Sequence, residues 1–268
     1  MIITTPYNYV MQISFDGSRY KGWQRQKSSE TTIQGRVEQV LSRLLTKPTN
    51  IIGCSRTDAG VHALGYVANF HTTTRLIETD FLQDLNNYLP DDIVIFNLQA
   101  IDDRFHARHN SISKLYSYRI DRRPQANPFS LGTRLHFANS LHLETMEKVA
   151  QLLCGEHDFR CFTTQKPDER SLKRELFHIE ILNQSDELQI NILGDAFLWN
   201  MARILAAVIL EGGMTEPGAR EAYLDKVCYL LKAQSRELAA SPLAVKGLFL
   251  QKVNYPNVFA LCESPFLA

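Results

Sequence analysis

Hydrophobic and polar positions along the first hundred residues follow two different periods. Val10 to Phe15 alternates weakly, with the period of two that is typical of a strand, and Asp16-Gly17 follows as a turn. From Ile33 to Leu45 the apolar residues recur every three or four positions, which predicts a helix with Thr31 or Thr32 as its N-cap. A second helix is expected over 80–88, and further strands near residue 51, over 65–71 and over 93–98.

The rest of the chain repeats these kinds of element without a visible repeat of sequence. Strands are expected over 114–121, 176–182, 188–193 and 248–253, and helices over 143–153, 197–211 and 219–231. This order predicts an α+β chain with two halves of similar plan, residues 1–107 and 108–268. Because no low-complexity linker separates them, we expect the halves to share one sheet or a tight interface.

Composition places the chain among ordinary globular proteins. Of its 268 residues, 44% are apolar and 22% charged, which argues against disorder and against a fibrous class. Lys plus Arg and Asp plus Glu both total 29, so any basic surface that binds nucleic acid must be local. The longest apolar run, 197–210, is too short to span a bilayer and contains polar residues, so no membrane association is expected.

The cysteines and histidines form no recognisable disulfide or metal-binding pattern. Five cysteines, an odd number without a Cys-x-x-Cys pair, favour reduced thiols in a cytosolic protein. No basic leader with an apolar core precedes the first strand, which also favours a cytoplasmic location. His106, His109 and His157 could be drawn as a metal site, but nothing in the sequence brings them together, and we expect no metal.

The run FLWNMARILAAVIL is apolar nearly all round, yet it contains Arg203. Such a helix is buried in most folds, and a buried guanidinium is costly unless a carboxylate or an RNA phosphate accepts its hydrogen bonds. The run therefore predicts an acidic partner elsewhere in the chain. The alternative is that Arg203 simply extends its charged end to the surface.

Asp58 fits the description of that partner. It lies in CSRTDAGVHALGYVANF, in a glycine-containing turn between two predicted strands, where a rigid scaffold commonly presents a functional group. An aspartate in a turn can equally bond backbone amides, and the local sequence does not decide between these roles. The orphan arginine at position 203 favours the functional role.

Two basic runs contain aromatic residues. Residues 16–27 include four basic residues against one acidic, together with Tyr20 and Trp23, and residues 104–123 include six basic residues against Asp121. Basic groups contact phosphates and aromatic faces stack on unpaired bases. Charge runs are more often solvated surface, and strand tyrosines such as Tyr116 and Tyr118 are more often half-buried sheet residues. The predicted acid–arginine pair shifts this balance toward RNA binding.

Several ordered motifs resemble the TruA family of tRNA pseudouridine synthases. CSRTDAGVHALGYVANF is similar to the family signature that contains the catalytic aspartate. The resemblance continues along almost the whole chain, in FDGSRYKGWQRQ, FHARHNSISKLYSY, GEHDFRCF, GDAFLWNMARIL and SPLAVKGLFLQKVNYP.

The resemblance implies a fold, a reaction and a set of site residues. The implied fold has two ferredoxin-like α+β halves that share a central antiparallel sheet flanked by helices. The implied protein is a cofactor-free homodimer that binds the anticodon stem-loop of tRNA and converts uridines at positions 38–40 to pseudouridine. By resemblance Asp58 is the catalytic aspartate, Arg203 pairs with it and Tyr116 packs on the target base. RNA contacts are expected from Lys21, Gln24, Arg25, Arg56, His62, Arg108 and Lys114.

The chain departs from the family pattern at a few positions. Ser55 stands where glycine usually precedes Arg-Thr-Asp, Trp199-Asn200 replaces a pair of histidines, and Ala207 replaces a glycine. Because the three catalytic positions are retained, these departures bear on RNA specificity more than on chemistry. A tRNA-binding chaperone, or a diverged enzyme for another RNA site, stays open as an alternative. A sugar-processing hydrolase lacks a second acid. The residues do not decide whether Asp58 attacks the sugar or removes a sugar proton.

Overall fold

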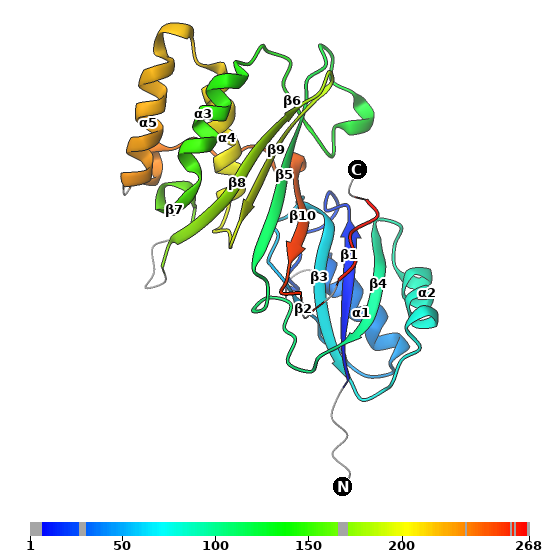
Figure 1. Ribbon diagram of the computed structural model, residues 1–268. Coiled ribbons are helices and arrows are strands. Elements are labelled where there is room, and N and C mark those ends of the chain that lie inside the picture. Colours follow the sequence, from blue (N-terminus) through cyan, green and yellow to red (C-terminus); the bar gives the residue numbers. More distant parts are fainter. Residues whose placement is uncertain are drawn as a thin grey trace. The chain divides into compact units, whose positions relative to one another are not determined.

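The structure, a computed structural model, describes residues 7–26, 31–165, 171–233, 235–257, 259 and 261–266 (Figure 1). The chain forms two compact units, one of residues 1–112 with 249–268 and one of residues 113–248. The sequence-based division at residues 107 and 108 places the end of the chain in the second half, whereas here it belongs to the first unit. A late strand can complete an early sheet because neighbouring strands need not be neighbours in sequence.

The first unit is built on a sheet with the strand order β4-β1-β3-β10. The central strand β1 (Tyr7–Phe15) pairs antiparallel with β3 (His62–Thr72) and β4 (Ile93–Ile101), and β2 (Ile52–Gly53) also pairs with β3. The last strand, β10 (Leu248–Asn254), pairs parallel with β3. Most of β1 is buried on both faces, which explains why its apolar alternation is weak in the sequence.

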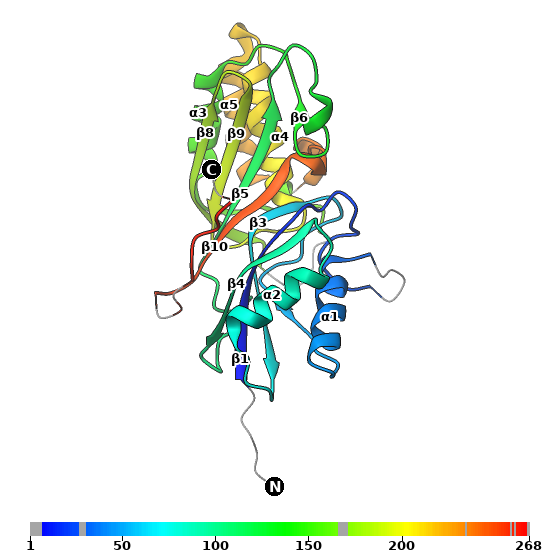
Figure 2. The same cartoon turned by 90° about the vertical axis from the view of Figure 1, so that its right-hand side faces the viewer.

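Two helices, α1 (Ile33–Leu44) and α2 (Glu78–Tyr88), complete the first unit and lie side by side (Figure 2). Of the two predicted caps of α1, Thr31 and Thr32, the structure has Thr32, whose side chain accepts a hydrogen bond from the Gly35 N–H at 3.2 Å. The apolar stripe of α1 is buried. The helix therefore forms where its periodicity predicts it.

Side chains on one face of β1 hold two later segments of the first unit. The Asn8 amide donates hydrogen bonds to the Asp102 and Phe105 carbonyls, both at 3.0 Å, and the Gln12 amide donates to the Cys262 carbonyl at 2.7 Å. Alternation along the strand places Asn8 and Gln12 on the same face. The backbone at residues 102, 105 and 262 is therefore fastened to the sheet through amide side chains.

The second unit has an antiparallel sheet with the strand order β5-β9-β8-β7. A short strand, β6 (Leu135–His136), pairs parallel with β5. The four main strands are β5 (Ser113–Asp121), β9 (Glu187–Gly194), β8 (Lys173–Asn183) and β7 (Gly155–Asp158).

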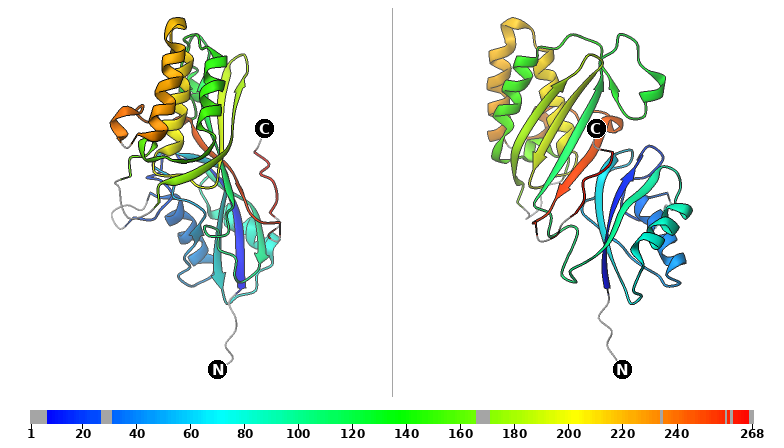
Figure 3. Two further views of the ribbon diagram at one scale, coloured as in Figure 1. Left: turned by 60° about the vertical axis from the view of Figure 1, so that its left-hand side comes forward. Right: turned by 45° about the vertical axis from the view of Figure 1, so that its right-hand side comes forward.

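Three helices, α3 (Leu143–Leu153), α4 (Met201–Met214) and α5 (Arg220–Lys232), lie on one side of this sheet (Figure 3). Nearly every residue of α4 is buried, as its sequence predicts. No helix among the described residues has both the length and the apolar character needed to cross a bilayer. Short 3-10 turns occur at Pro128–Ser130, Arg160–Phe162, Pro217–Ala219, Arg236–Leu238 and Val245–Gly247.

The α+β class is confirmed, since each unit combines a mostly antiparallel sheet with flanking helices. The main difference from the sequence-based elements is the start of α4, which begins at Met201 instead of residue 197. Asn200 adopts a left-handed conformation with φ of 62°, which no helix interior tolerates. The chain therefore turns at Asn200 before the helix begins.

Candidate active site

Asp58 lies in the loop of residues 54–61 that connects β2 with β3. The Val61 N–H donates a hydrogen bond to the Asp58 carbonyl at 3.2 Å, and Gly60 supplies the positive φ of 82° that the turn requires. The Asp58 side chain is half-buried, whereas its neighbour Arg56 is exposed. The loop thus presents a partly shielded carboxylate from a closed turn.

The turn that follows β1 packs directly behind this loop. The Trp23 N–H donates to the Thr57 carbonyl at 3.1 Å. Gly22 has a φ of +84°, and a Cβ at this position would lie 2.5 Å from the Thr57 carbonyl oxygen and 3.1 Å from the Asp58 carbonyl carbon. Only glycine fits both the conformation and the space. The motif FDGSRYKGWQRQ therefore serves, at least in part, as the support of the Asp58 loop.

Two stacked aromatic rings hold the beginning of the loop. Trp23 stacks on Tyr66 with ring centroids 3.9 Å apart, and both side chains are buried. The Tyr66 hydroxyl donates to the Ser55 carbonyl and accepts from the Ser55 N–H at 3.3 Å. Tyr20 is also buried and donates its hydroxyl to Asp92. The expectation that Trp23 offers a free face for stacking is therefore wrong, because that ring stacks on Tyr66 in the core.

His62, an expected RNA contact, instead joins β3 to the turn after β1. Only 1% of it is exposed, its ring stacks on Phe249 at 4.6 Å, and its Nδ1 lies 3.2 Å from the Gly17 N–H and 3.1 Å from Asp16 Oδ1. Burial raises the pKa of Asp16, but hydrogen bonds from Ser18 and the nearby His62 outweigh it and hold that pKa below its usual value. His62 thus fastens the first residue of β3 to the turn after β1.

The second unit presents Arg203 from the first turn of α4, where the side chain is half-buried. Its Nε donates to the Leu243 carbonyl at 2.6 Å, and its Nη1 donates to Asn200 Oδ1 at 2.7 Å. Asn200 is itself tied down, because its Nδ2 donates to Thr164 Oγ1 at 2.8 Å. The guanidinium is therefore held from two sides by neutral acceptors. Its pairing with Asp58, which belongs to the other unit, stays a prediction.

Tyr116 and Tyr118 project from the same face of β5. Tyr116 is 6% exposed and meets Phe197 edge-on, with ring centroids 4.8 Å apart. The Tyr118 hydroxyl donates to the Ala244 carbonyl at 2.6 Å. Burial raises the pKa of Tyr118, and the nearby Arg203 lowers it only in part. The second unit thus brings the Tyr116 strand next to the start of the Arg203 helix.

The other expected RNA contacts differ in exposure. Lys21 is exposed, like Arg56, whereas Arg108 is half-buried and Lys114 is only 7% exposed. Arg25 is exposed but forms a 3.0 Å ion pair with the buried Glu38. The Gln24 amide donates to Gln34 Oε1 at 2.7 Å.

Part of the charge in the two basic runs is balanced by acids. Arg19 donates two hydrogen bonds to Asp92, one of them at 2.9 Å. Arg123 donates two to Asp121, at 2.8 and 2.9 Å, and these bonds hold the pKa of Asp121 well below its usual range. Local counts of charge therefore overestimate the positive surface of these runs.

Two of the three histidines considered as metal ligands, His106 and His109, lie together in the first unit. The rings of His106 and His109 lie 4.1 Å apart, and His106 Nδ1 accepts backbone hydrogen bonds from Arg108 and His109, both at 3.2 Å. His157 belongs to the other unit, where its Nε2 contacts the Cys154 carbonyl. Among the described residues no group of three His, Cys, Asp or Glu side chains could hold a metal ion.

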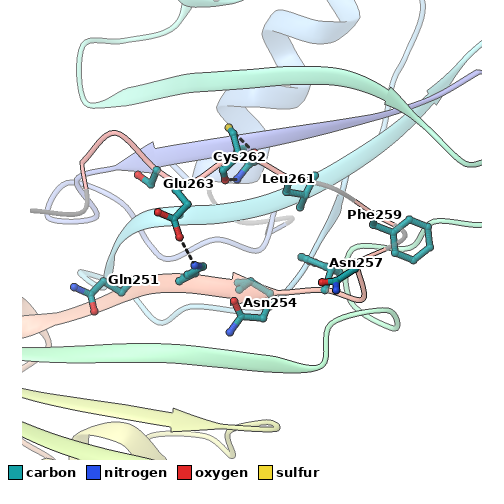
Figure 4. A pocket seen from close by; sticks show the side chains of 13 residues that line it. Gln251, Asn254, Asn257, Phe259, Leu261, Cys262 and Glu263 are labelled. Carbon is teal, nitrogen blue, oxygen red and sulfur yellow. Dashed lines mark hydrogen bonds and ion pairs between the residues drawn. The ribbon is translucent and has the colours of Figure 1, made fainter.

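A polar cavity of about 360 Å³ lies in the first unit between β10 and the segment that follows it (Figure 4). Lys252 and Glu263 form a 2.8 Å ion pair across it, and the Cys262 thiol donates to Gln12 Oε1 at 3.0 Å. None of the expected site residues lines this cavity. It marks where the end of the chain covers the sheet, apart from the Asp58 loop.

Comparison with known proteins identifies the family. Residues 11–110 and 149–256 match the family model described as tRNA pseudouridine synthase. tRNA pseudouridine synthase A 2 of Bacillus anthracis is 39% identical over 92% of this chain and 99% of that protein. tRNA pseudouridine synthase A 1 of Clostridium tetani is 38% identical over 92% of this chain and 99% of that protein.

A more remote likeness comes from a solved structure, the archaeal box H/ACA sRNP Nop10-Cbf5 complex. It is 11% identical, with a TM-score of 0.39, over 92% of this chain and 60% of that chain. The sequence matches cover most of both partners, and they decide the assignment. The chain belongs to the TruA-type tRNA pseudouridine synthases, a family of enzymes that isomerise uridine to pseudouridine.

Proposed function

We propose that this protein isomerises uridine in the anticodon stem-loop of tRNA, at positions 38–40, with Asp58 as the catalytic carboxylate. It acts as a cytoplasmic homodimer and needs neither a metal nor an organic cofactor. The observation that carries the proposal is the placement of Asp58, a half-buried carboxylate on a closed loop inside the matched region 11–110. A carboxylate in such a place can act on a sugar without redox chemistry.

The reaction exchanges one bond to the sugar for another. The bond between C1′ and N1 of the uridine breaks, the base turns, and a bond between C1′ and C5 forms. The C5 proton is lost and N1 gains a proton, so no oxidant or reductant is needed. Asp58 assists the first bond cleavage, either by attack on the sugar or by removal of a sugar proton.

Arg203 would keep Asp58 ionised and aimed. An adjacent cation favours the charged form of a carboxylate and lowers its pKa. Because Asn200 and the Leu243 carbonyl hold the guanidinium at 2.7 and 2.6 Å, Arg203 loses little orientational freedom when it meets a carboxylate.

Tyr116 would retain the detached base beside its sugar. Its ring is already fixed by the edge-on contact with Phe197, so one face can serve as a platform for the base. The target nucleotide must first leave the helical stack, which costs a few kcal/mol. Phosphate contacts from exposed basic residues such as Lys21 and Arg56 would offset this cost.

The substitution Asp58→Asn tests the proposal. We expect tritium release from tRNA that contains 5-tritiated uridine to fall by about a thousand-fold or more, the scale seen when a catalytic group is removed. The Kd for tRNA should change little, because the substitution keeps the size of the side chain. The matched control is Asp84→Asn, which alters an exposed carboxylate on α2.

Two results would count against the proposal. Normal turnover by the Asp58→Asn protein would end the catalytic assignment. Restoration of growth or of tRNA function by this variant in cells without the wild-type protein would favour the tRNA-binding chaperone.

A further inference from the structure

A groove of about 660 Å³ on the first unit carries positive charge that the proposed reaction does not use. Its walls come from the turn after β1, from α1 and from the end of α2. Three arginines line it, Arg19, Arg36 and Arg43, together with the rings of Tyr20 and Tyr88. All of these residues belong to the first unit.

The arginines of α1 are arranged on one face of the helix. Along α1, Gln39 follows Arg36 after three residues and Arg43 follows it after seven. This spacing places the three side chains along one stripe of the helix. The Arg36 guanidinium donates to Gln39 Oε1 at 3.4 Å, and the Arg43 guanidinium lies 4.6 Å above the Tyr88 ring. The residues on the other side of α1, such as Val37 and Leu41, are buried. Packing of α1 therefore fixes the direction in which both arginines face.

The charge of this groove is not balanced within the described part of the chain. Asp92 lies beside it and is occupied by two hydrogen bonds from Arg19 and one from the Tyr20 hydroxyl. Among the described residues no ion pair involves Arg36 or Arg43. Guanidinium groups in this situation are well suited to bind phosphate, which accepts two parallel hydrogen bonds from each.

One end of the groove lies close in the chain to the support of the Asp58 loop. Tyr20 lines the groove, and Gly22, two residues later, contacts the Thr57 and Asp58 backbone. Two residues span roughly 7 Å at most. A nucleic acid strand in a duplex has a phosphate about every 3.4 Å along the axis. An RNA with its uridine at Asp58 would therefore have backbone phosphates, a few nucleotides away, within reach of the groove.

We propose that this groove binds the phosphate backbone of the RNA substrate next to the target uridine, with Arg36 and Arg43 as the phosphate ligands. The inference rests on the proposed function, because it takes tRNA as the substrate. Phosphate contacts position a nucleic acid without reading its sequence. The groove would therefore add affinity and fix the register of the stem, and it would leave the choice of base to the Asp58 site.

The test compares two double variants in tRNA binding over a range of KCl concentrations. Arg36→Gln with Arg43→Gln should raise the Kd for tRNA about tenfold, and should reduce the slope of log Kd against log salt by about 1.4–1.8, the value for two phosphate contacts. Arg36→Lys with Arg43→Lys keeps both charges and should retain most of the slope. In the glutamine double variant the loss should appear more in the KM for tRNA than in the kcat for tritium release.

The control variant is Arg75→Gln, because Arg75 is exposed in the same unit but does not line the groove. If the glutamine double variant kept the wild-type Kd and salt slope, while the wild type modified tRNA normally, the proposed phosphate site in the groove would be contradicted. An equal loss of tRNA affinity in Arg75→Gln would also contradict the proposal, because the effect would then come from the loss of positive charge anywhere on the unit. If tRNA binding depended on Arg36 and Arg43 but the wild type released no tritium, the phosphate site would be supported and the proposed function would be contradicted.

Discussion

The loop that carries Asp58 and the helix that carries Arg203 are held by different kinds of contact. Backbone proximity fixes the loop, since Gly22 and Trp23 meet the Thr57 carbonyl directly. Side-chain hydrogen bonds fix Arg203, through Asn200 and the Leu243 carbonyl. A contact between backbones tolerates almost no added atom, whereas a contact through a side chain can be changed without moving the chain. The Asp58 loop should therefore be the more fragile of the two.

Gly22→Ala should have the largest effect in this comparison. The left-handed backbone costs an alanine about 1–2 kcal/mol, and the contact of its Cβ with the Thr57 carbonyl adds the cost of overpacking, so we expect a loss of about 2–4 kcal/mol in unfolding free energy. Displacement of the loop by about 1 Å should lower kcat roughly a hundred-fold. Chemical denaturation and tritium release measure the two effects.

Gly218→Ala is the matched control, because an added Cβ there meets nothing within 4 Å. A stable, active Gly22→Ala protein would show that the loop is not held by this contact, and the difference between the two regions would disappear.

Asn200→Gly should have a smaller effect and should act mainly through Arg203. Glycine accepts the φ of 62° and removes only the side chain, so the change isolates the hydrogen bonds to Arg203 and Thr164. A hydrogen bond to a charged group contributes about 1.5–3 kcal/mol, and the Leu243 carbonyl still holds the guanidinium in this variant, so kcat should fall about tenfold, the lower end of that range, while the Kd for tRNA stays the same. Single-turnover tritium release measures the change.

The control for this variant is Thr46→Gly, since Thr46 has a similar backbone conformation with φ of 51° and no part in the site. If Asn200→Gly weakened tRNA binding and left kcat intact, the role of Asn200 would be to bind the RNA and not to position Arg203.

Asp16→Asn should have the smallest effect, because it removes only the carboxylate beside His62. The pKa of Asp16 lies below its usual value, so the ionised form stabilises the fold above the unfolded-state pKa near 3.8. This stabilisation, less than about 1 kcal/mol for a half-exposed group, is lost as the pH falls through the folded-state pKa. The Tm difference between wild type and variant should therefore be constant above pH 5 and shrink below pH 4. A difference that grows in acid would contradict this assignment.

Short-range features of the fold were predictable from the sequence, while several contacts between residues distant in the chain were not. The α1 helix and its Thr32 cap follow from residues within one turn of each other. The pairing of β10 with β3, by contrast, joins residues almost two hundred positions apart, and no local pattern indicates it. The same limit applies to Arg25, whose partner Glu38 lies on a helix beyond the basic run.

For the candidate site, the sequence offered candidate reactive groups but few of the residues that support them. Arg203 and Asp58 were first indicated by their local sequence, the resemblance to the family added Tyr116, and the roles of all three stay predictions. Trp23 looked like a stacking residue because its neighbours are basic, yet it stacks in the core on Tyr66. Asn200 was noticed only as a departure from the family. The signal that could have identified it is an asparagine directly before a helix that carries a buried arginine, since asparagine accepts left-handed conformations.

A double-mutant cycle on Asp58 and Arg203 tests the central claim most directly. Single-turnover tritium release is measured for Asp58→Asn, for Arg203→Gln and for the double variant, with circular dichroism to check that each is folded. If the two groups act as a unit, the double variant should be no slower than Asp58→Asn alone. Rate losses that multiply would show that the two residues act independently, and would contradict the account.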